Sequence, residues 1–491
     1  MKPEDKLINE RIDKLNQIKD MGINPYPYRF TKKNKSSEIL EKFTKAGHAP
    51  GKESVSLAGR ILTIRLMGKA CFAHVQDEDG KIQIYVRQDE IGEKSYGLLK
   101  KLDMGDMIGF EGSVFKTKAG EISIWVKNVE LLSKNIRPLP EKWHGLKDTE
   151  LRYRKRHLDL ITNPEVKETF VKRAKLINYI REFLNKKNYL EVETPAIQSI
   201  YGGAAAKPFK SFLNDLKMNV FLRISDELYL KRLIVGGFDK VYEICKDFRN
   251  ESIDSTHNPE FTMLEFYEAY ADYNDMMKLV EDMIIGACKE VNGTDKIHFR
   301  GHTIEIKKPF AVLKMKNAIK KYAKIDVDKL NDKEFKTTLD KHKIKYDKFN
   351  RGEAIQLLFE EFVEDKLVQP TFIIEHPKET TPLCKLSREN PELIERFELF
   401  VAGFELGNAY SELNDPILQR KFLEDSAKQL TEGNEEANPV DEDFLEAIET
   451  GMPPTGGVGI GIDRLSMVLL GKDSIKDVIL FPFMKSFKEV K

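Results

Sequence analysis

The sequence predicts an α+β protein in which a small β-barrel precedes a larger domain built on an antiparallel sheet flanked by helices. Three observations carry this prediction. Short β-type runs separated by turn residues fill residues 55–133. A long amphipathic helical pattern begins at residue 166. Hairpin-like pairs of strands follow it instead of alternating strand–helix units, which disfavours a doubly wound parallel sheet.

Length and composition set the outer limits. The 491 residues are too many for one ordinary domain and predict two or three. Hydrophobic residues make up 41% and charged residues 33%, which is typical of a globular protein with enough apolar material for a core. No apolar run has membrane-spanning length and no secretory signal is visible, so we expect no membrane partner and a cytoplasmic location. The net charge of +0 neither indicates nor excludes a polyanionic partner.

Residues 1–54 are predicted to form an N-terminal helix and a connector. Apolar residues recur at helical spacing through residues 5–21, and Gly22 with the following prolines ends the pattern. The four cysteines are far apart in the sequence, so no pair has metal-ligand or redox spacing. We expect all four to be reduced and mostly buried.

Residues 55–133 are predicted to form a barrel of the OB type. The expected strands cover residues 55–66, 70–76, 81–86, 107–116 and 121–131, with a helix at 96–102. Five short strands with one helical insert are typical of this fold. Residues 134–165 are predicted to be a linker, because Arg137–Pro140 places prolines at alternate positions and stiffens the chain.

Residues 166–491 are predicted to form the second domain, with a helical insertion at about 309–365. Val241–Arg249 and Phe261–Ala269 are expected to be two strands of a hairpin with a long loop. On each strand one set of alternate side chains is charged or mixed and the other is apolar. This pattern predicts a sheet covered by helices on one face and open to a cleft on the other.

Two segments supply arginines suited to an anionic ligand. Arg249 lies in FRNESIDSTHNPEF, and its planar guanidinium can bond two phosphate oxygens at once. Arg464 ends the glycine-rich GIGIDR, where glycines let the backbone approach a flat ligand and Asp463 is expected to cap the following helix. If the fold brings them together, they form a triphosphate site without a Walker-type loop. The alternative for Arg249 alone is a surface salt bridge with Asp247 or Glu251.

A third segment, residues 396–412, carries two carboxylates suited to a metal. Glu398 shares strand parity with Asn408, whereas Glu405 does not, so a bulge near Gly403 or Gly407 is needed to bring Glu405 to the same face. Two carboxylates beside a triphosphate suit Mg²⁺. The alternative is an ordinary edge strand with its polar residues outward.

Together these segments resemble the three signature motifs of the class II aminoacyl-tRNA synthetases. The first resembles residues 166–195, the second 241–267 and the third 456–470. Within that class the sequence is similar to the lysyl-tRNA synthetase family over nearly its whole length. The segments specific to the lysine enzymes are YGGAAAKPF at 201–209, ELYLKRLIVGGF at 227–238 and FELGNAYSELND at 404–415. Thr381 and Cys384 depart from the usual Ser and Ala, and we expect no change of activity.

The resemblance implies that the chain ligates L-lysine to tRNA(Lys), through a lysyl-adenylate formed from ATP with release of pyrophosphate. The implied ATP-binding residues are Arg249, Glu251, His257, Asn258, Phe261, Glu405 and Arg464, with Arg249 and Arg464 catalytic. The implied lysine-binding residues are Gly203, Glu227, Arg249, Glu265, Tyr267, Asn408, Tyr410 and Glu412. Glu398 and Glu405 would hold Mg²⁺, up to about three ions per active site. Phe72, Gln83 and Glu121 would contact the anticodon, and the first motif would form a homodimer.

Three alternatives stay open at this point. A related enzyme that lysylates a protein would lack the barrel that residues 55–133 predict. A non-catalytic nucleic-acid-binding relative would have lost Arg249, Glu405 or Arg464, all of which are present. Phe72 could be a core residue of the barrel and have no part in binding.

Overall fold

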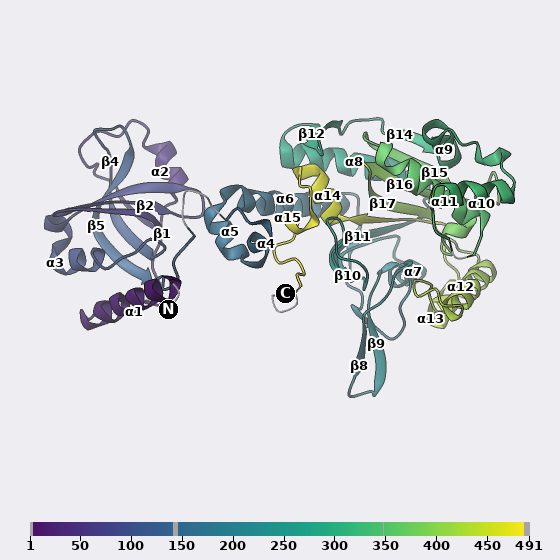
Figure 1. Cartoon of the computed structure of the whole chain (residues 1–491), viewed down its shortest axis with the longest axis horizontal. Helices are drawn as coiled ribbons and strands as arrows, with labels where there is room; N and C mark the ends of the chain where they lie inside the picture. Colours follow the sequence, from purple (N-terminus) through teal and green to yellow (C-terminus); the bar gives the residue numbers. More distant parts are fainter. Residues whose placement is uncertain (1–2, 141–145, 347, 486–491) are drawn as a thin grey trace. The chain divides into compact units, whose positions relative to one another are not determined.

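The computed structural model describes residues 3–140, 146–346 and 348–485 (Figure 1). The chain divides into two compact units, Met1–Gly145 and Leu146–Lys491. Among the described residues, no helix combines the length and the apolar character needed to cross a bilayer.

The first unit is a closed five-stranded barrel with strand order β1-β2-β3-β5-β4, which confirms the predicted OB-fold. Its strands are β1 (Ser54–Met67), β2 (Ala70–Gln76), β3 (Lys81–Arg87), β4 (Met107–Lys116) and β5 (Ile122–Ser133). Helix α3 (Gln88–Leu99) begins directly after β3, eight residues before the predicted start. The apolar pattern gives no sign of that start, because the first half of α3 is polar and kinks at Gly92, whose φ is 81°.

The N-terminal segment packs on this barrel. Helix α1 (Pro3–Asp20) contributes the buried Ile18 to the barrel core, and α2 (Ser36–Lys42) contributes the buried Ile39. The range predicted as a connector therefore contains a short second helix.

The second unit is built on one eight-stranded sheet with the order β14-β15-β16-β17-β18-β11-β10-β6. Its strands are β6 (Leu190–Glu191), β10 (Lys240–Phe248), β11 (Glu260–Ala269), β14 (Ala311–Lys314), β15 (Thr371–Pro377), β16 (Leu393–Val401), β17 (Phe404–Ser411) and β18 (Thr455–Gly461). The centre is antiparallel, as predicted, but β14–β15 and β6–β10 pair in parallel at the two edges. The sheet is therefore mixed.

One face of the sheet is covered by helices α6 (Pro164–Lys186), α8 (Tyr273–Asn292) and α14 (Ile462–Leu470) (Figure 1). The even-numbered side chains of β10 and β11, such as Tyr242, Leu264 and Phe266, enter this apolar core. Strand periodicity accounts for this burial, because alternate side chains share a face.

Two predicted ranges contain more structure than expected. Residues 134–165 include α4 (Thr149–Arg154) and α5 (Arg156–Thr162), which belong to the second unit, while residues 141–145 lie outside the described residues. Arg156 is buried and donates hydrogen bonds to backbone carbonyl oxygens of residues 476–480. Its Nε lies 2.9 Å from the carbonyl oxygen of Leu480. The range 309–365 contains β14 and then α9 (Met315–Ala323), α10 (Asp332–Lys341) and α11 (Arg351–Phe362), which share a separate core.

The second unit contains further helices and strands. They are β7 (Ile197–Gln198), β8 (Lys210–Leu213), β9 (Met218–Leu222), α7 (Glu227–Val235), β12 (Lys296–Phe299), β13 (His302–Glu305), α12 (Pro416–Thr431), α13 (Glu442–Glu449) and α15 (Ile475–Val478). Strands β8 and β9 form a hairpin that projects from this unit (Figure 1).

Candidate active site

A cleft of about 460 Å³ opens over the sheet of the second unit. The odd-numbered side chains of β11 from Phe261 to Tyr267 line it, as their parity predicted. The predicted ATP- and lysine-binding residues that line this cleft are Gly203, Glu227, Arg249, Glu251, His257, Asn258, Phe261, Glu265, Tyr267, Glu405, Asn408, Tyr410, Glu412 and Arg464. Of the residues predicted for the second unit, only the metal candidate Glu398 is not among the lining residues.

A bulge in β17 brings Glu405 to the open face of the sheet. Phe400 pairs with Glu405, but Leu399 pairs with Gly407, so β17 carries one extra residue. Residues directly opposite each other in a sheet point to the same side. Glu405 therefore shares a face with Glu398 and Asn408, and the predicted bulge near Gly407 is confirmed.

The fold joins the two arginine segments at one end of the cleft. Arg464 donates one hydrogen bond to the backbone carbonyl of Glu405 at 3.1 Å and another to Nε2 of His257 at 3.0 Å. His257 is oriented by Asp254, whose carboxylate lies 2.8 Å from Nδ1. Two segments far apart in the sequence thus present basic groups to one place, beside Glu405.

Asp463, predicted to cap α14, has a different role. The helix is preceded by Gly461, and no side chain caps it. The Asp463 carboxylate accepts a hydrogen bond from the backbone N–H of Thr262 at 2.7 Å and pairs with Arg173 at 2.7 Å. Asp463 is a buried residue of α14. Because it bonds Thr262 of β11 and Arg173 of α6, it holds these three elements together.

Arg249 has the environment of a ligand-binding arginine. Its guanidinium lies 5.1 Å from the centre of the Phe261 ring, and its Nε donates to the carbonyl of Ile224 at 3.4 Å. Among the residues that the structure describes, no carboxylate lies within 4 Å of its guanidinium, so the alternative salt bridges with Asp247 and Glu251 are not formed. A positive charge in a cleft without a fixed partner is suited to an anionic ligand.

Glycines make room for a ligand at the other end. A Cβ on Gly457 would collide with the side chains of Glu412 and Tyr267. Gly203 has a φ of +90°, and a Cβ there would lie 2.8 Å from Oγ of Ser225. The backbone at both positions approaches the cleft more closely than any other residue type allows.

Two buried carboxylates at this end share an internal cation. Lys231 Nζ lies 2.5 Å from Oε1 of Glu227 and 2.5 Å from Oε2 of Glu412. Burial lowers the pKa of Lys231, but the two carboxylates outweigh it and the net direction is upward. Lys231 lies one helical turn after Glu227 on α7. The structure places it against both carboxylates and behind the cleft lining.

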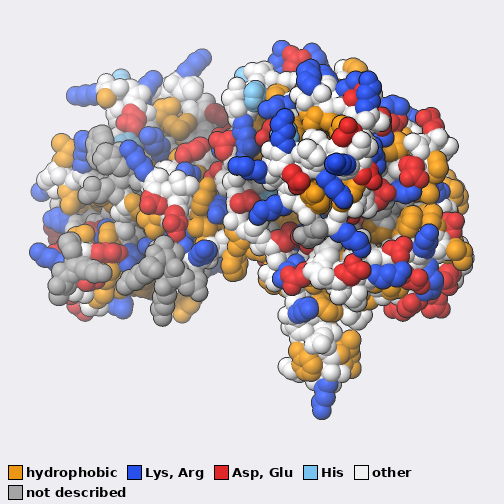
Figure 2. All heavy atoms as spheres, turned by 45° about the vertical axis from the view of Figure 1, so that its right-hand side comes forward, with side chains coloured by type: hydrophobic (Ala, Val, Ile, Leu, Met, Phe, Trp, Pro, Cys, Tyr) orange, Lys and Arg blue, Asp and Glu red, His pale blue; other side chains and the backbone are white. Residues whose placement is uncertain are grey.

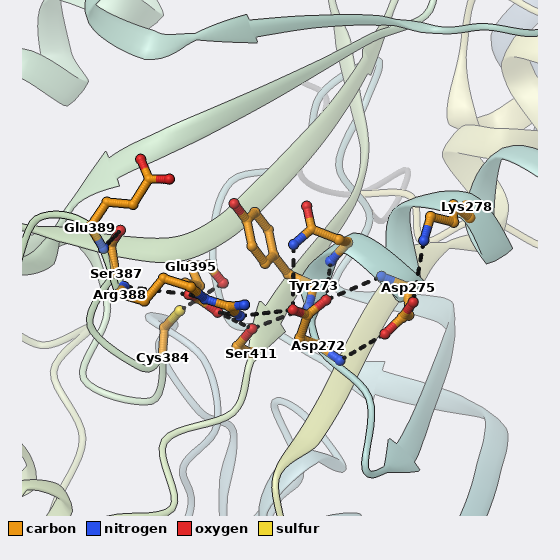
Figure 3. A network of polar contacts seen from close by, with 11 residues as sticks. Asp272, Tyr273, Asp275, Lys278, Cys384, Ser387, Arg388, Glu389, Glu395 and Ser411 are labelled. Atoms are coloured by element: carbon orange, nitrogen blue, oxygen red, sulfur yellow. Dashed lines mark hydrogen bonds and ion pairs between the residues drawn. The ribbon is translucent and has the colours of Figure 1, made fainter.

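A polar network fixes the end of β17 beside Glu412 (Figure 3). Ser411 donates to Glu395 at 2.6 Å, and Arg388 bridges Glu395 at 2.5 Å and Asp272 at 2.7 Å. Asp272 is the N-cap of α8. The network therefore ties the strand that directly precedes Glu412 to the helix layer, and no local sequence pattern indicated it.

The two metal candidates lie in an acidic region. Glu398 pairs with Arg396, which also donates to Asn408 at 3.0 Å. Burial, together with the charges of Glu405 and Glu360, raises the pKa of Glu398 to about 7 despite the opposing charge of Arg396. Oxygen donors that repel one another fit a hard cation such as Mg²⁺.

In the barrel, Phe72 and Gln83 lie on the outer face and are partly exposed, so Phe72 is not a core residue. Gln83 donates to Glu121 at 2.8 Å. The Phe72 ring centre lies 4.6 Å from that of Tyr85, which continues to Trp125 at 5.0 Å. These residues form a polar group beside an aromatic surface, which is suited to stacked bases.

Comparison with known proteins gives two family matches. Residues 148–485 match the model of class II tRNA synthetases for aspartate, lysine and asparagine (D, K and N). Residues 55–132 match the model of the OB-fold nucleic acid binding domain.

Individual relatives match along almost the full chain. A lysine–tRNA ligase of Carboxydothermus hydrogenoformans is 50% identical over 98% of both chains. One of Methanoculleus marisnigri is 49% identical over 97% of this chain and 94% of its own. One of Pelotomaculum thermopropionicum is 51% identical over 98% of this chain and 95% of its own.

Proposed function

We propose that this chain, which belongs to the class II tRNA synthetases of the aspartate, lysine and asparagine group, is a lysine–tRNA ligase. The observation that carries the choice of amino acid is the buried pair Glu227 and Glu412, which reaches the cleft beside Tyr267. A buried ammonium group needs carboxylate partners, and a neutral side chain would leave those carboxylates without one. Lys231 supplies one positive charge to two carboxyl groups, so the pair has room for a second cation.

ATP would occupy the other end of the cleft. Arg249 would bridge the α-phosphate and the lysine carboxylate, while Arg464 and His257 would hold the distal phosphates. The adenine would stack on Phe261 and meet Glu251, which lies in the same loop as His257. Asn258 is buried at the base of this loop and would fix it.

Mg²⁺ would be held by Glu398 and Glu405 together with phosphate oxygens. Bound there, it neutralises charge on the triphosphate. Glu405 is the residue of the two that lines the cleft, and Arg396 holds Glu398 behind it.

The chemistry needs no side-chain nucleophile. The lysine carboxylate attacks the α-phosphorus in line, forms lysyl-adenylate and releases pyrophosphate. The terminal ribose of the tRNA then attacks the adenylate carbonyl and releases AMP. The protein contributes positioning, through Glu265, Asn408 and Gly203 around the amino acid, and stabilises the developing negative charge through Arg249 and Arg464.

The barrel would bind the anticodon of tRNA(Lys). Phe72 would stack an unpaired base, and Gln83 and Glu121 would contact its edge. The hydrogen bond between Gln83 and Glu121 orders both side chains before the RNA arrives.

A homodimer would form through the first signature motif. Large apolar side chains near this region are exposed, and some lie on the hairpin that projects downward in Figure 2. They are Leu190, Ile197, Phe212, Leu213 and Leu216. Exposed apolar residues gathered in this way are typical of an interface between chains.

Amino-acid-dependent exchange of pyrophosphate into ATP tests the function directly. Each of the twenty amino acids is supplied in turn, and only lysine should support exchange. Exchange with aspartate or asparagine, or with none, would refute the assignment. Transfer of lysine to unfractionated tRNA, with a protein acceptor as the second arm, separates the tRNA enzyme from a protein-modifying relative.

A further inference from the structure

Three buried carboxyl groups lie together behind the amino-acid end of the cleft. They belong to Asp226, Asp247 and Glu265, and one oxygen of each lies within 4.8 Å of the others. Asp226 and Asp247 are completely buried, and Glu265 is 4% exposed. Only Glu265 lines the cleft.

Their partners differ. Glu265 accepts hydrogen bonds from Ser225 at 3.0 Å and Tyr267 at 2.9 Å. Asp247 lies 3.5 Å from the guanidinium of Arg223. Asp226 has no such partner among the described residues, because neither of its oxygens has a hydrogen bond and no cation lies within ion-pair distance.

The charged and titratable groups around Asp226 come from every neighbouring element. They are Glu243, Cys245 and Asp247 of β10, Glu265 and Tyr267 of β11, Glu227 and Lys231 of α7, Glu412 after β17, and Arg223 and Arg249 of the flanking segments. The basic side chains of this region that form ion pairs do so with carboxylates other than Asp226. Arg223 pairs with Glu243 at 2.8 Å, and Lys231 holds Glu227 and Glu412.

Two adjacent buried carboxyls without a cation cannot both remain ionised, because burial and mutual repulsion disfavour the second charge. Burial, followed by the charge of Asp247, raises the pKa of Glu265 to about 8. Burial, followed by the charge of Glu265, raises the pKa of Asp226 well above its usual range. One proton between them also supplies the hydrogen bond that Asp226 otherwise lacks.

We propose that Asp226 and Glu265 share one proton while the amino-acid site is empty, and that the α-ammonium group of lysine displaces this proton when it binds. The inference rests on the proposed function, in which Glu265 positions the amino acid. The proton passes to solvent and the ammonium takes its place, so the total charge of the site stays constant. Asp226 does not line the cleft and acts through Glu265, as a positioning residue.

Calorimetry counts the proton directly. Lysine is titrated into the full-length chain at pH 7 in buffers of different ionisation enthalpy, and the slope of the binding enthalpy against the buffer enthalpy gives the protons released. The comparison ligand is 6-aminohexanoate, which has the carboxylate and the distal ammonium but no α-ammonium. Lysine should release about one proton more than 6-aminohexanoate. Equal release by the two ligands would overturn the proposal.

The variant Asp226→Asn tests the pair. The amide donates a hydrogen bond without a proton to lose, so lysine should still bind, and the difference in release between the two ligands should disappear. In the original chain, the apparent lysine KM should fall by up to about tenfold from pH 6 to pH 7. In Asp226→Asn, the KM should change less over the same pH range. Asp215→Asn, at an exposed position of the β8–β9 connection, is the matched control and should behave as the original chain.

Two further outcomes are decisive. A divalent metal that copurifies with the original chain and is lost from Asp226→Asn, measured by elemental analysis, would replace the proton with a cation and overturn the proposal. Lysine-dependent pyrophosphate exchange is measured on the same samples. Exchange without a proton difference rejects only this inference, whereas no exchange rejects the proposed function together with it.

Discussion

Substitution of Lys231 by methionine tests the electrostatics of the amino-acid site. The ammonium of Lys231 lies 2.5 Å from a carboxylate oxygen of both Glu227 and Glu412, and its side chain is completely buried. Methionine keeps the length and the apolar stem, so the change removes the charge with little loss of packing. Removal of one partner from a buried ion pair costs about 3–5 kcal/mol. We expect the free energy of unfolding of the second unit to fall by about that amount.

Urea unfolding followed by circular dichroism measures this loss, with the transition of the second unit fitted separately from that of the barrel. The matched control is Lys316→Met, which removes a surface pair with Asp328 at 2.7 Å. The control should lose less than about 1 kcal/mol. If Lys231→Met loses no more than the control, Glu227 and Glu412 are neutral in the empty site, and the argument that they form a charged receptor for an ammonium is wrong.

The other predictions concern binding. Glu412→Gln should raise the lysine KM by more than about a hundredfold in pyrophosphate exchange, because it leaves a buried ammonium one carboxylate short, and should change the ATP KM little; equal effects on both would contradict its role. Gly457→Ala should abolish lysine binding in calorimetry while ATP still binds, because its Cβ would occupy space beside Glu412 and Tyr267; unchanged lysine affinity would show that the ligand lies elsewhere. Phe72→Ala should raise the tRNA KM in aminoacylation by about five- to a hundredfold, from the loss of one stacked base, and leave lysine-dependent exchange unchanged; an unchanged tRNA KM would contradict anticodon stacking.

Strand parity predicted the open face of β11 because the strand is long and its pairing is regular on both sides. The parallel edges of the sheet had no such signal. Strand β6 has two residues and β14 has four, too few to show a period, and only pairing with long neighbours defines them as strands.

The lining of the cleft was predictable where one segment carried its own chemistry, as with Arg249 and Arg464. It was not predictable where function depends on contacts across the fold. Lys231 meets Glu412 only through tertiary packing, and Asp226 is buried although an aspartate before a helix is usually a solvated cap. The cytoplasmic location stays a prediction from the sequence.

The extra residue in β17 determines which side chains of this strand face the cleft. On one side of the bulge Glu405 faces the phosphate end of the cleft, and on the other side Asn408 and Tyr410 face the amino-acid end. Loss of a single residue between them would turn one half of the strand over while the other kept its orientation. Side chains along this strand can be exchanged one at a time, but its length cannot change, because the distance in sequence from Glu405 to Asn408 is what allows one strand to serve both substrates.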